Sequence, residues 1–571
     1  MKPFSNQFFA FTGAWGLDIK TVHLFVISAA LAGAPCAWAA DSRSCQSPVP
    51  HASVEIDKAA GGAILSYRFP EKISCFRLSD AGKVRALTWT MLTAGAKLVD
   101  DGNTVVLATP ARRFDVSIVP FARDGQIDRV YSPVIAFGDR RAVAVYSRYL
   151  AASEATKLVV RYKGYLPLGS SAHVGRHAFT YRGDDTYLIV GEPKVTQRGR
   201  SALVLDRATP PWLIAHAGDS VIRGTSTLAK HFSLPRRLTY LVTYTEAEAD
   251  VAQWRGDTSA QLVRLNFMGA RWQSSDPPRL ADLTGFILHE LFHTVNHVLA
   301  PSVAGDGGLS LLEGSAEAAA SSLRNSLGVL DERAFTSVKD AALLRCQSIP
   351  GNTLADKERN NTRAAPYACG AAIQYLGAAL LTGDAGGPDA MLRVWRQMLL
   401  DKTGPYDWAR YFAALRALAG PQARPQVDLL EKLVSGAEPL SSVLAGLERQ
   451  HLIRKLTDRE QQGPAQSAFF AQLTLDQILD SHCTGMRGTY FLDGIYTLDA
   501  PAASCAGLPD KFPVASINGY ALAQQGHNAF LEHQRRCAAR GQSTLHDAKG
   551  AVISIACSEP RQNVELYGFL H

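Results

Sequence analysis

Two histidines stand four positions apart, at His289 and His293, and Glu290 directly follows the first. In an α-helix, residues at this spacing lie on one face, so both imidazoles can reach one metal ion at about 2.0–2.1 Å. The carboxylate beside the first histidine is then placed to accept a proton from a water molecule on that metal. The flanking apolar residues suit a helix buried in a domain, and they are Phe286, Ile287, Leu291, Phe292, Val295 and Val298.

A third metal ligand is expected on a second helix. The segment 311–318 has helical character and contains Glu313, and an Asp-Gly-Gly turn at 306–308 lets the two helices pack side by side. A catalytic zinc keeps three protein ligands and one open position. We therefore predict a Zn²⁺ ion held by His289, His293 and Glu313, with Glu290 as the general base. A buried helix whose histidines are satisfied by hydrogen bonds is the alternative interpretation.

Two further polar residues lie near these predicted ligands. Glu317 follows Glu313 by one turn, so it either accepts a hydrogen bond from the outer nitrogen of a ligand histidine or lies on a solvated helix face. His297 lies one turn beyond His293, about 6 Å further along the axis by the helix rise, and is too far away to share a tetrahedral site with His289. We expect His297 to be a polar residue of the cleft.

The two metal-binding segments resemble the zinc signature of the gluzincin aminopeptidases, on residues 289–293 and 312–317. Two families of this type are similar to the chain: the aminopeptidase N family, and the glycyl aminopeptidase family, which has a PDZ domain after its catalytic domain. Segment 366–371 resembles the Tyr-x-Lys-Gly segment of the aminopeptidase N family, with Cys369 in place of the lysine. The resemblance implies that the Tyr367 hydroxyl stabilises the oxyanion. A core tyrosine on an Ala-rich helix is the alternative.

The periodicity of the chain changes along its length. Residues 53–195 read as short strands separated by Gly, Asp and Pro, whereas residues 280–452 have helical periodicity almost throughout. Between them we expect a helix at 212–232 and strands at 238–244 and 262–267. Within the helical part we expect helices at 390–400, 408–418 and 427–434.

This layout is that of a multidomain α+β protein and resembles the glycyl aminopeptidase family. We expect an N-terminal β-sandwich-like domain, a thermolysin-like mixed lobe with a helical lobe, and a C-terminal PDZ-like β domain. In the last, 514–519 looks like the central PDZ strand and turn, and 552–555 like a closing strand; PDZ modules bind extended peptides by strand addition. The expected boundaries are 1–39 for a signal peptide, 40–197 for the β domain, 198–455 for the catalytic domain, 456–470 for a linker and 471–571 for the PDZ-like domain.

The N-terminus has the features of an export signal. An apolar run at 22–34 precedes Ala37-Trp38-Ala39, the small-x-small pattern of a cleavage site. The run is too short for a membrane anchor, the alternative, and we expect no span after signal removal. Eight cysteines remain after residue 39, and an oxidising periplasm or extracellular space would let neighbours pair; eight reduced thiols are the alternative. The expected disulfides are Cys45–Cys75, Cys346–Cys369, Cys483–Cys505 and Cys537–Cys557.

The charge of the chain points away from nucleic acid. The net charge is +7 over 571 residues, and the basic residues form no run. The expected partner is a peptide or protein substrate. Two other functions stay open: a peptide-binding protein with an inactive peptidase domain, and a zinc hydrolase of a small non-peptide substrate.

Substrate preference is expected to differ from that of the aminopeptidase N family. In that family a glutamate in the motif Gly-x-Met-Glu-Asn binds the free amine of the substrate, because a buried cation needs an anionic partner. Here Met268 lies at the comparable position, and Arg271 rather than a carboxylate follows it. We expect this segment to form the strand that lines the cleft and pairs with the substrate backbone. We also expect the protein to cleave inside peptides or to accept blocked N-termini. An acid from elsewhere, such as Asp276 or Glu317, would reverse this expectation.

Overall fold

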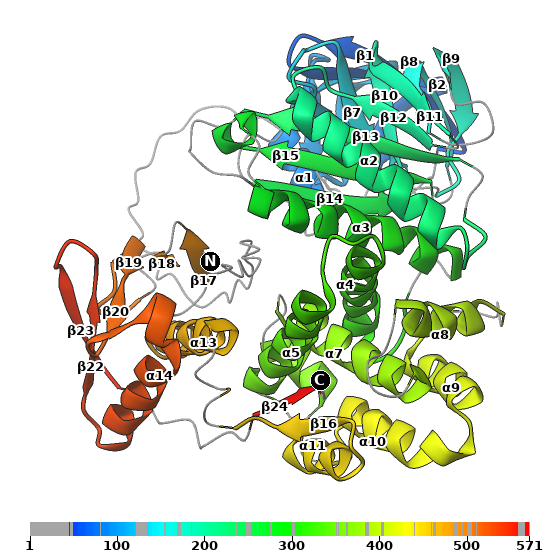
Figure 1. Ribbon diagram of the computed structural model, residues 1–571. Coiled ribbons are helices and arrows are strands. Elements are labelled where there is room, and N and C mark those ends of the chain that lie inside the picture. The colour runs from blue at the N-terminus through cyan, green and yellow to red at the C-terminus, as the bar shows by residue number, and fades with distance from the viewer. Residues whose placement is uncertain are drawn as a thin grey trace. The chain divides into compact units, whose positions relative to one another are not determined.

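The computed structural model describes Cys45 and residues 49–569, with gaps of which the longest covers 121–133 and the others at most eight residues. The expected signal peptide, 1–39, lies outside the described residues. The chain divides into two compact units. One ends at Ile222 and also takes in Leu234–Leu280, and the other comprises Arg223–Ser233 and Ala281–His571 (Figure 1).

The β-rich region of the first unit is a ten-stranded sheet, ordered β3-β5-β2-β1-β8-β10-β7-β6, with β4 on β5 and β9 on β8. Its apolar side chains alternate along β1, where Val54 and Ile56 are buried. The expected sandwich of two sheets is instead one hydrogen-bonded sheet. The long strands β2 and β5 shift register between Arg68 and Cys75, and such irregularities let one sheet curl around its own core. The strands are β1 His51–Ala59, β2 Gly62–Arg77, β3 Trp89–Met91, β4 Ala96–Val99, β5 Thr104–Ile118, β6 Val134–Ala136, β7 Ala142–Tyr146, β8 Lys157–Tyr165, β9 Val174–Thr180 and β10 Tyr187–Gly191.

A second sheet of five strands follows, ordered β11-β12-β13-β15-β14. Strands β12, β13 and β15 are parallel, which a crossover helix such as α2 (Pro211–Leu228) allows between β12 and β13. Nearly continuous burial along these strands is typical of parallel sheets covered on both faces. The strands are β11 Lys194–Arg198, β12 Ser201–Leu205, β13 Leu238–Thr245, β14 Gln253–Ser259 and β15 Leu262–Met268.

The expected strands at 238–244 and 262–267 are confirmed, but the pairing with substrate backbone expected for the second is wrong. Strand β15, which ends at Met268, pairs with β13 on one side and β14 on the other. Its backbone groups are therefore taken, and it cannot pair with a substrate strand. The edge strands of this sheet are β11 and β14, and Asp257 of β14 forms a buried ion pair with Arg264 of β15.

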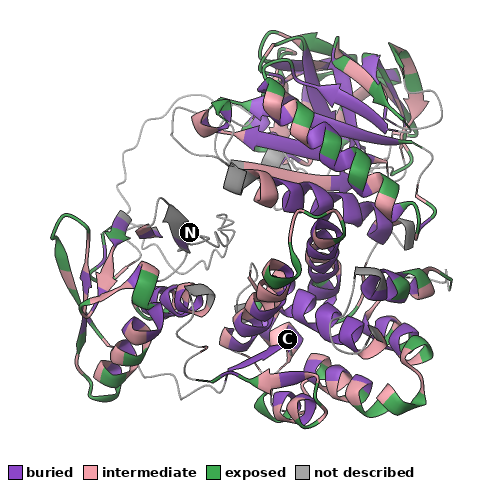
Figure 2. Ribbon diagram, in the orientation of Figure 1, coloured by how far each residue is buried: buried purple, intermediate pink, exposed green. Residues whose placement is uncertain are grey.

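The second unit contains most of the helices. The expected helices at 390–400, 408–418 and 427–434 are confirmed as α8, α9 and α10. Figure 2 shows α4 and α7 to be largely buried, as the central helices of this region. The helices are α3 Pro277–Leu299, α4 Gly308–Ser326, α5 Glu332–Ser348, α6 Leu354–Asn360, α7 Ala364–Thr382, α8 Pro388–Leu400, α9 Trp408–Ala419, α10 Arg424–Ser435 and α11 Leu440–Arg449.

Helices α4 and α7 approach one another through two glycines. A Cβ atom on Gly314 would lie 2.3 Å from the Gly370 Cα, and one on Gly370 would lie 2.0 Å from the Ser310 carbonyl oxygen. Only glycine allows this approach. Although no membrane span was expected after the signal, residues 364–381 of α7 are long and apolar enough to cross a membrane by length and composition, and 78% of this stretch is buried inside the protein. Its alanines and glycines serve close packing here.

The C-terminal part forms two small sheets with two helices, the strand orders being β17-β18-β19 and β21-β20-β22-β23. The turn expected within 514–519 joins β20 to β21, and Asn518 and Gly519 both have positive φ, as a two-residue hairpin turn requires. Helix α13 begins at Pro464, inside the segment expected to be a linker, and proline is well tolerated in a first turn. The elements are α13 Pro464–His482, β17 Gly488–Leu492, β18 Ile495–Asp499, β19 Lys511–Val514, β20 Ser516–Ile517, β21 Tyr520–Ala521, α14 Leu522–Ala538, β22 Gln542–His546 and β23 Val552–Ala556.

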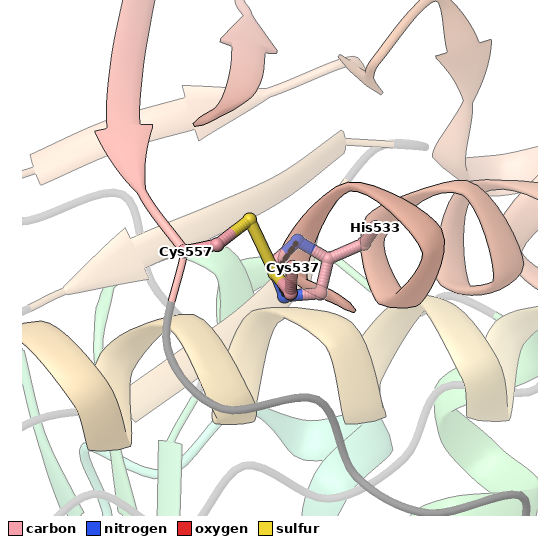
Figure 3. A group of neighbouring side chains, drawn as sticks. All are labelled: His533, Cys537 and Cys557. Atoms are coloured by element: carbon pink, nitrogen blue, oxygen red, sulfur yellow. Dashed lines mark hydrogen bonds between the residues drawn. A yellow bond between two sulfur atoms is a disulfide. The ribbon is translucent and has the colours of Figure 1, made fainter. Parts of the chain in front are cut away.

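Disulfides join all four expected pairs of cysteines. Cys346–Cys369 links α5 to α7, and Cys537–Cys557 links α14 to the residue after β23 (Figure 3). The others are Cys45–Cys75 and Cys483–Cys505. The chain end also returns to the helical region, where β24 (Tyr567–Phe569) pairs with β16 (Ile453–Lys455).

Candidate metal centre

The two histidines of α3 face each other across one helical turn. Their Nε2 atoms lie 3.1 Å apart, and the rings meet nearly at right angles with centroids 4.8 Å apart. Both residues are over nine-tenths buried. Leu288 and Phe292, which precede the two histidines in the helix, are fully buried as well. Each ring is thus held with one nitrogen directed at a shared point.

Helix α4 brings a carboxylate to the same point. Glu313 Oε2 lies 3.2 Å from Nε2 of His289 and 3.5 Å from Nε2 of His293. The turn before α4 allows this, because Gly307 caps the helix with a positive φ of 71°. Three ligand atoms at tetrahedral angles, about 2.0–2.1 Å from a zinc ion, lie about 3.4 Å from one another. The observed separations fit one such ion with a fourth position left open.

The charges around this point favour a cation. Burial opposes protonation of His289, but its hydrogen bonds to Glu313 and Glu317 outweigh burial and raise its pKa to about 10. For Glu313, burial favours the neutral acid, yet the two histidines hold the pKa of the carboxyl well below its usual range. The surrounding carboxylates therefore stabilise positive charge on this group, whether the charge is carried by a proton or by a metal ion.

Outer partners orient both imidazoles. Glu317 Oε2 lies 3.4 Å from Nδ1 of His289. Glu317 therefore faces the outer nitrogen of a ligand histidine, which is the first of the two alternatives that the sequence left open. Asn296 Oδ1 lies 3.1 Å from Nδ1 of His293, and the Asn296 amide donates to Ser315 Oγ at 3.3 Å. A proton on each Nδ1 leaves each Nε2 lone pair free for a metal. Asn296 was not predicted in this role from the sequence, although its position three residues after His293 places both residues on one helix face.

Tyr367, in the first turn of α7, stacks on the His289 ring at 5.7 Å between centroids with 24° between the planes. Burial and then the nearby carboxylates of Glu313 and Glu290 raise its pKa well above the ordinary value. The phenol therefore keeps its proton and remains a hydrogen-bond donor. Glu290 is itself buried, and its charge acts on both His289 and Tyr367.

His297 is not among the metal-binding residues that the structure brings together. Among the described residues, the metal-binding cluster of this region comprises His289, His293 and Glu313, without His297, which lies in the last turn of α3. Met268 and Arg271 belong to the other compact unit. Asp276 lies outside the described residues.

Comparisons with known proteins found solved structures of low similarity to this chain. No protein-family model matches the chain, and no curated protein matches its sequence. A crystal structure of Legionella pneumophila aminopeptidase A in complex with aspartic acid is similar at a TM-score of 0.38 and 12% identity over 69% of this chain. The match spans half the length of that aminopeptidase. A structure of yeast LTA4 hydrolase in complex with Bestatin has a TM-score of 0.38 and 9% identity, covering 75% of this chain and 72% of that one.

Proposed function

We propose that this protein is an exported, zinc-dependent metallopeptidase of the gluzincin type. The observation that carries the proposal is the triangle of ligand atoms from His289, His293 and Glu313, 3.1–3.5 Å apart, with Glu290 next in sequence to the first ligand. Two nitrogens and one carboxylate oxygen form a ligand set typical of catalytic zinc, which leaves a position open for water or substrate. When bound there, Zn²⁺ polarises a carbonyl group and lowers the pKa of its water towards about 7.

Glu290 is the general base of the proposed reaction. Its carboxylate takes a proton from the attacking water and then gives that proton to the leaving amine, so the residue ends in its starting state. Its burial among charged ligands keeps the proton from exchanging freely with solvent.

Tyr367 acts on the oxygen of the scissile carbonyl. The oxygen gains negative charge as the water adds, and a neutral phenol beside the metal ligands is a donor fixed in place before the reaction begins. Cys346–Cys369 holds the start of α7 to α5, two residues from Tyr367. The disulfide therefore limits movement of the helical turn that carries Tyr367.

Export and a peptide substrate complete the proposal. The signal-like segment at 1–39 leads to an oxidising compartment, and the four disulfides suit it. We infer that the protein cleaves inside peptides or accepts blocked N-termini, because Glu317, one of the two acids that would reverse this expectation, is engaged with His289 rather than free to bind an ammonium group.

The test is hydrolysis of a mixed peptide library by zinc-loaded protein. Wild type should cut peptides, Glu290→Gln should bind zinc and cut none, and a control at exposed Glu332, Glu332→Gln, should behave as wild type. Matched peptides with free and acetylated N-termini then test preference, and both should be cut. Zinc-loaded wild type that cuts no library member contradicts peptidase activity. Sequential removal of single residues from free N-termini alone contradicts only the preference.

A further inference from the structure

Helix α4, which carries the ligand Glu313, begins without a cap from its own N-terminal residue. That residue is Gly307, which has no side chain to accept from the free N–H groups of the first turn. Such groups have no partner inside a helix, and a turn without a cap is less stable. Glu313 lies only one turn beyond Ser310, so a loose first turn would move the carboxylate that completes the metal centre.

A residue of another helix supplies the cap. Glu358, on α6, accepts two hydrogen bonds from Ser310 through a single oxygen: Glu358 Oε1 lies 2.6 Å from the Ser310 backbone nitrogen and 2.6 Å from Ser310 Oγ. Ser310 is fully buried, and Glu358 is half-buried. A carboxylate in this position satisfies a free N–H group and also complements the partial positive charge of the helix N-terminus.

Helix α6 holds Glu358 in place. Its start is fixed by a reciprocal pair of bonds, from the Thr353 N–H to Asp356 Oδ2 at 3.0 Å and from the Asp356 N–H to Thr353 Oγ1 at 2.8 Å. Next to Glu358, the buried ammonium group of Lys357 donates to the Cys346 carbonyl oxygen of α5 at 3.1 Å. The short helix is thus tied to α5 and to the first turn of α4.

Trp408 fixes the turn before α4 from another direction. Its indole N–H donates to the Gly307 carbonyl oxygen at 2.7 Å. That bond lies upstream of the helical residues, whereas Glu358 is bonded inside the first helical turn. Glu358 therefore acts on the part of α4 that leads directly to Glu313.

We propose that Glu358 is a positioning residue for the metal ligand Glu313. The role rests on the proposed function, in which zinc binds to Glu313 and the two histidines. With the cap in place, the first turn of α4 is formed before zinc arrives, and the Glu313 carboxylate already faces both imidazoles. Without the cap, the turn is formed for only part of the time, and the apparent zinc dissociation constant rises as that fraction falls.

The test is the zinc dissociation constant of the full chain, measured by competition with a chromogenic chelator. Glu358→Ala should raise the constant about fivefold or more, the ratio that corresponds to the usual loss of a helix cap. Glu358→Gln keeps an oxygen that accepts from Ser310, and it should raise the constant only about twofold, because a neutral acceptor bonds less strongly than a charged one.

Asp331→Ala is the matched control. Asp331 caps α5 by accepting from the Ala334 N–H at 2.7 Å, and α5 carries none of the three ligands. Loss of this cap should lower the stability of the protein and leave the zinc dissociation constant at the wild-type value. If Asp331→Ala and Glu358→Ala weaken zinc binding equally, the effect is one of general stability and the proposal is wrong.

A double variant shows whether Glu358 acts through Glu313. In Glu313→Ala only the two histidines hold the ion, so adding Glu358→Ala should not weaken the residual binding further. A loss of the same size in both backgrounds, or a wild-type constant in Glu358→Ala, would overturn the proposal. If Glu358→Ala lacks native circular dichroism, Glu358→Gln decides, and a wild-type constant there overturns it. Zinc affinities that follow these predictions in a protein that cuts no peptide support the positioning role and contradict peptidase activity alone.

Discussion

Glu317 Oε2 lies 3.4 Å from Nδ1 of His289, the ring nitrogen opposite the Nε2 that faces Glu313. The two carboxylates come from successive turns of α4, so one helix face both completes the ligand triangle and orients one of its histidines. The contact sets the tautomer of His289 and increases the basicity of the coordinating nitrogen.

Glu317→Ala should therefore weaken zinc binding without removing a ligand. We expect the zinc dissociation constant to rise about 10- to 100-fold, the usual effect of losing an outer partner. Competition with a chromogenic chelator measures it. Glu332→Ala, at the exposed start of α5, is the control and should leave the constant unchanged. Equal zinc affinity in Glu317→Ala and wild type would show that this contact does not act on the metal.

Asn296→Leu should weaken zinc binding in the same way through the other histidine. The change removes the oxygen that faces Nδ1 of His293 and also the amide bonded to Ser315. Asn296→Asp keeps an acceptor at that position and should retain affinity closer to wild type. Equal losses in the two variants would indicate a packing effect instead of control of the histidine tautomer.

Tyr367→Phe should slow hydrolysis and leave zinc in place. Loss of one oxyanion donor lowers kcat by about a hundredfold or more, and KM should change little because the ground-state carbonyl makes the weaker contact. Tyr375→Phe, two turns further along the same helix, is the matched control. A Tyr367→Phe variant with wild-type kcat would assign the residue to the core, the alternative raised from the sequence.

The pair Cys346→Ser, Cys369→Ser should lower both stability and kcat. Loss of a native disulfide costs about 2–4 kcal/mol of unfolding free energy, and this one also holds the segment bearing Tyr367. Cys45→Ser, Cys75→Ser is the control, since it removes a disulfide of the other compact unit. Thermal melts and kcat are measured together. If both pairs alter kcat alike, the positioning role of Cys346–Cys369 is excluded.

Acid should destabilise the C-terminal region through His533. Burial, and secondarily the charge of His482, lowers its folded pKa to about 4 from an unfolded value near 6.5. The unfolded chain then binds more protons between these values, so stability is full above about pH 6.5 and falls towards pH 4, by about 3 kcal/mol in all. Urea titrations of wild type and His533→Asn check this. Between about pH 6.5 and pH 4 the unfolding free energy of His533→Asn should depend less on pH than that of wild type. His51→Asn, which changes an exposed histidine, is the control and should keep the wild-type pH dependence.

Local spacing explains what the sequence could predict. His289, His293 and Glu313 are brought together by helix periodicity and one glycine turn, and the disulfides join cysteines near in sequence. The strand ending at Met268 was misplaced because its partners, β13 and β14, are set by sheet order and not by its own residues. The single ten-stranded sheet was missed for the same reason: alternation shows which face is buried but not how strands pair.

Zinc content tests the central claim most directly. Purified wild-type protein, dialysed against trace zinc under oxidising conditions, should contain about one zinc per chain, in keeping with three protein ligands around one ion. Glu290→Gln should contain the same amount, and the double variant His293→Ala, Glu313→Ala should contain none while keeping native circular dichroism. One zinc still bound by the folded double variant would contradict the assignment of the metal centre.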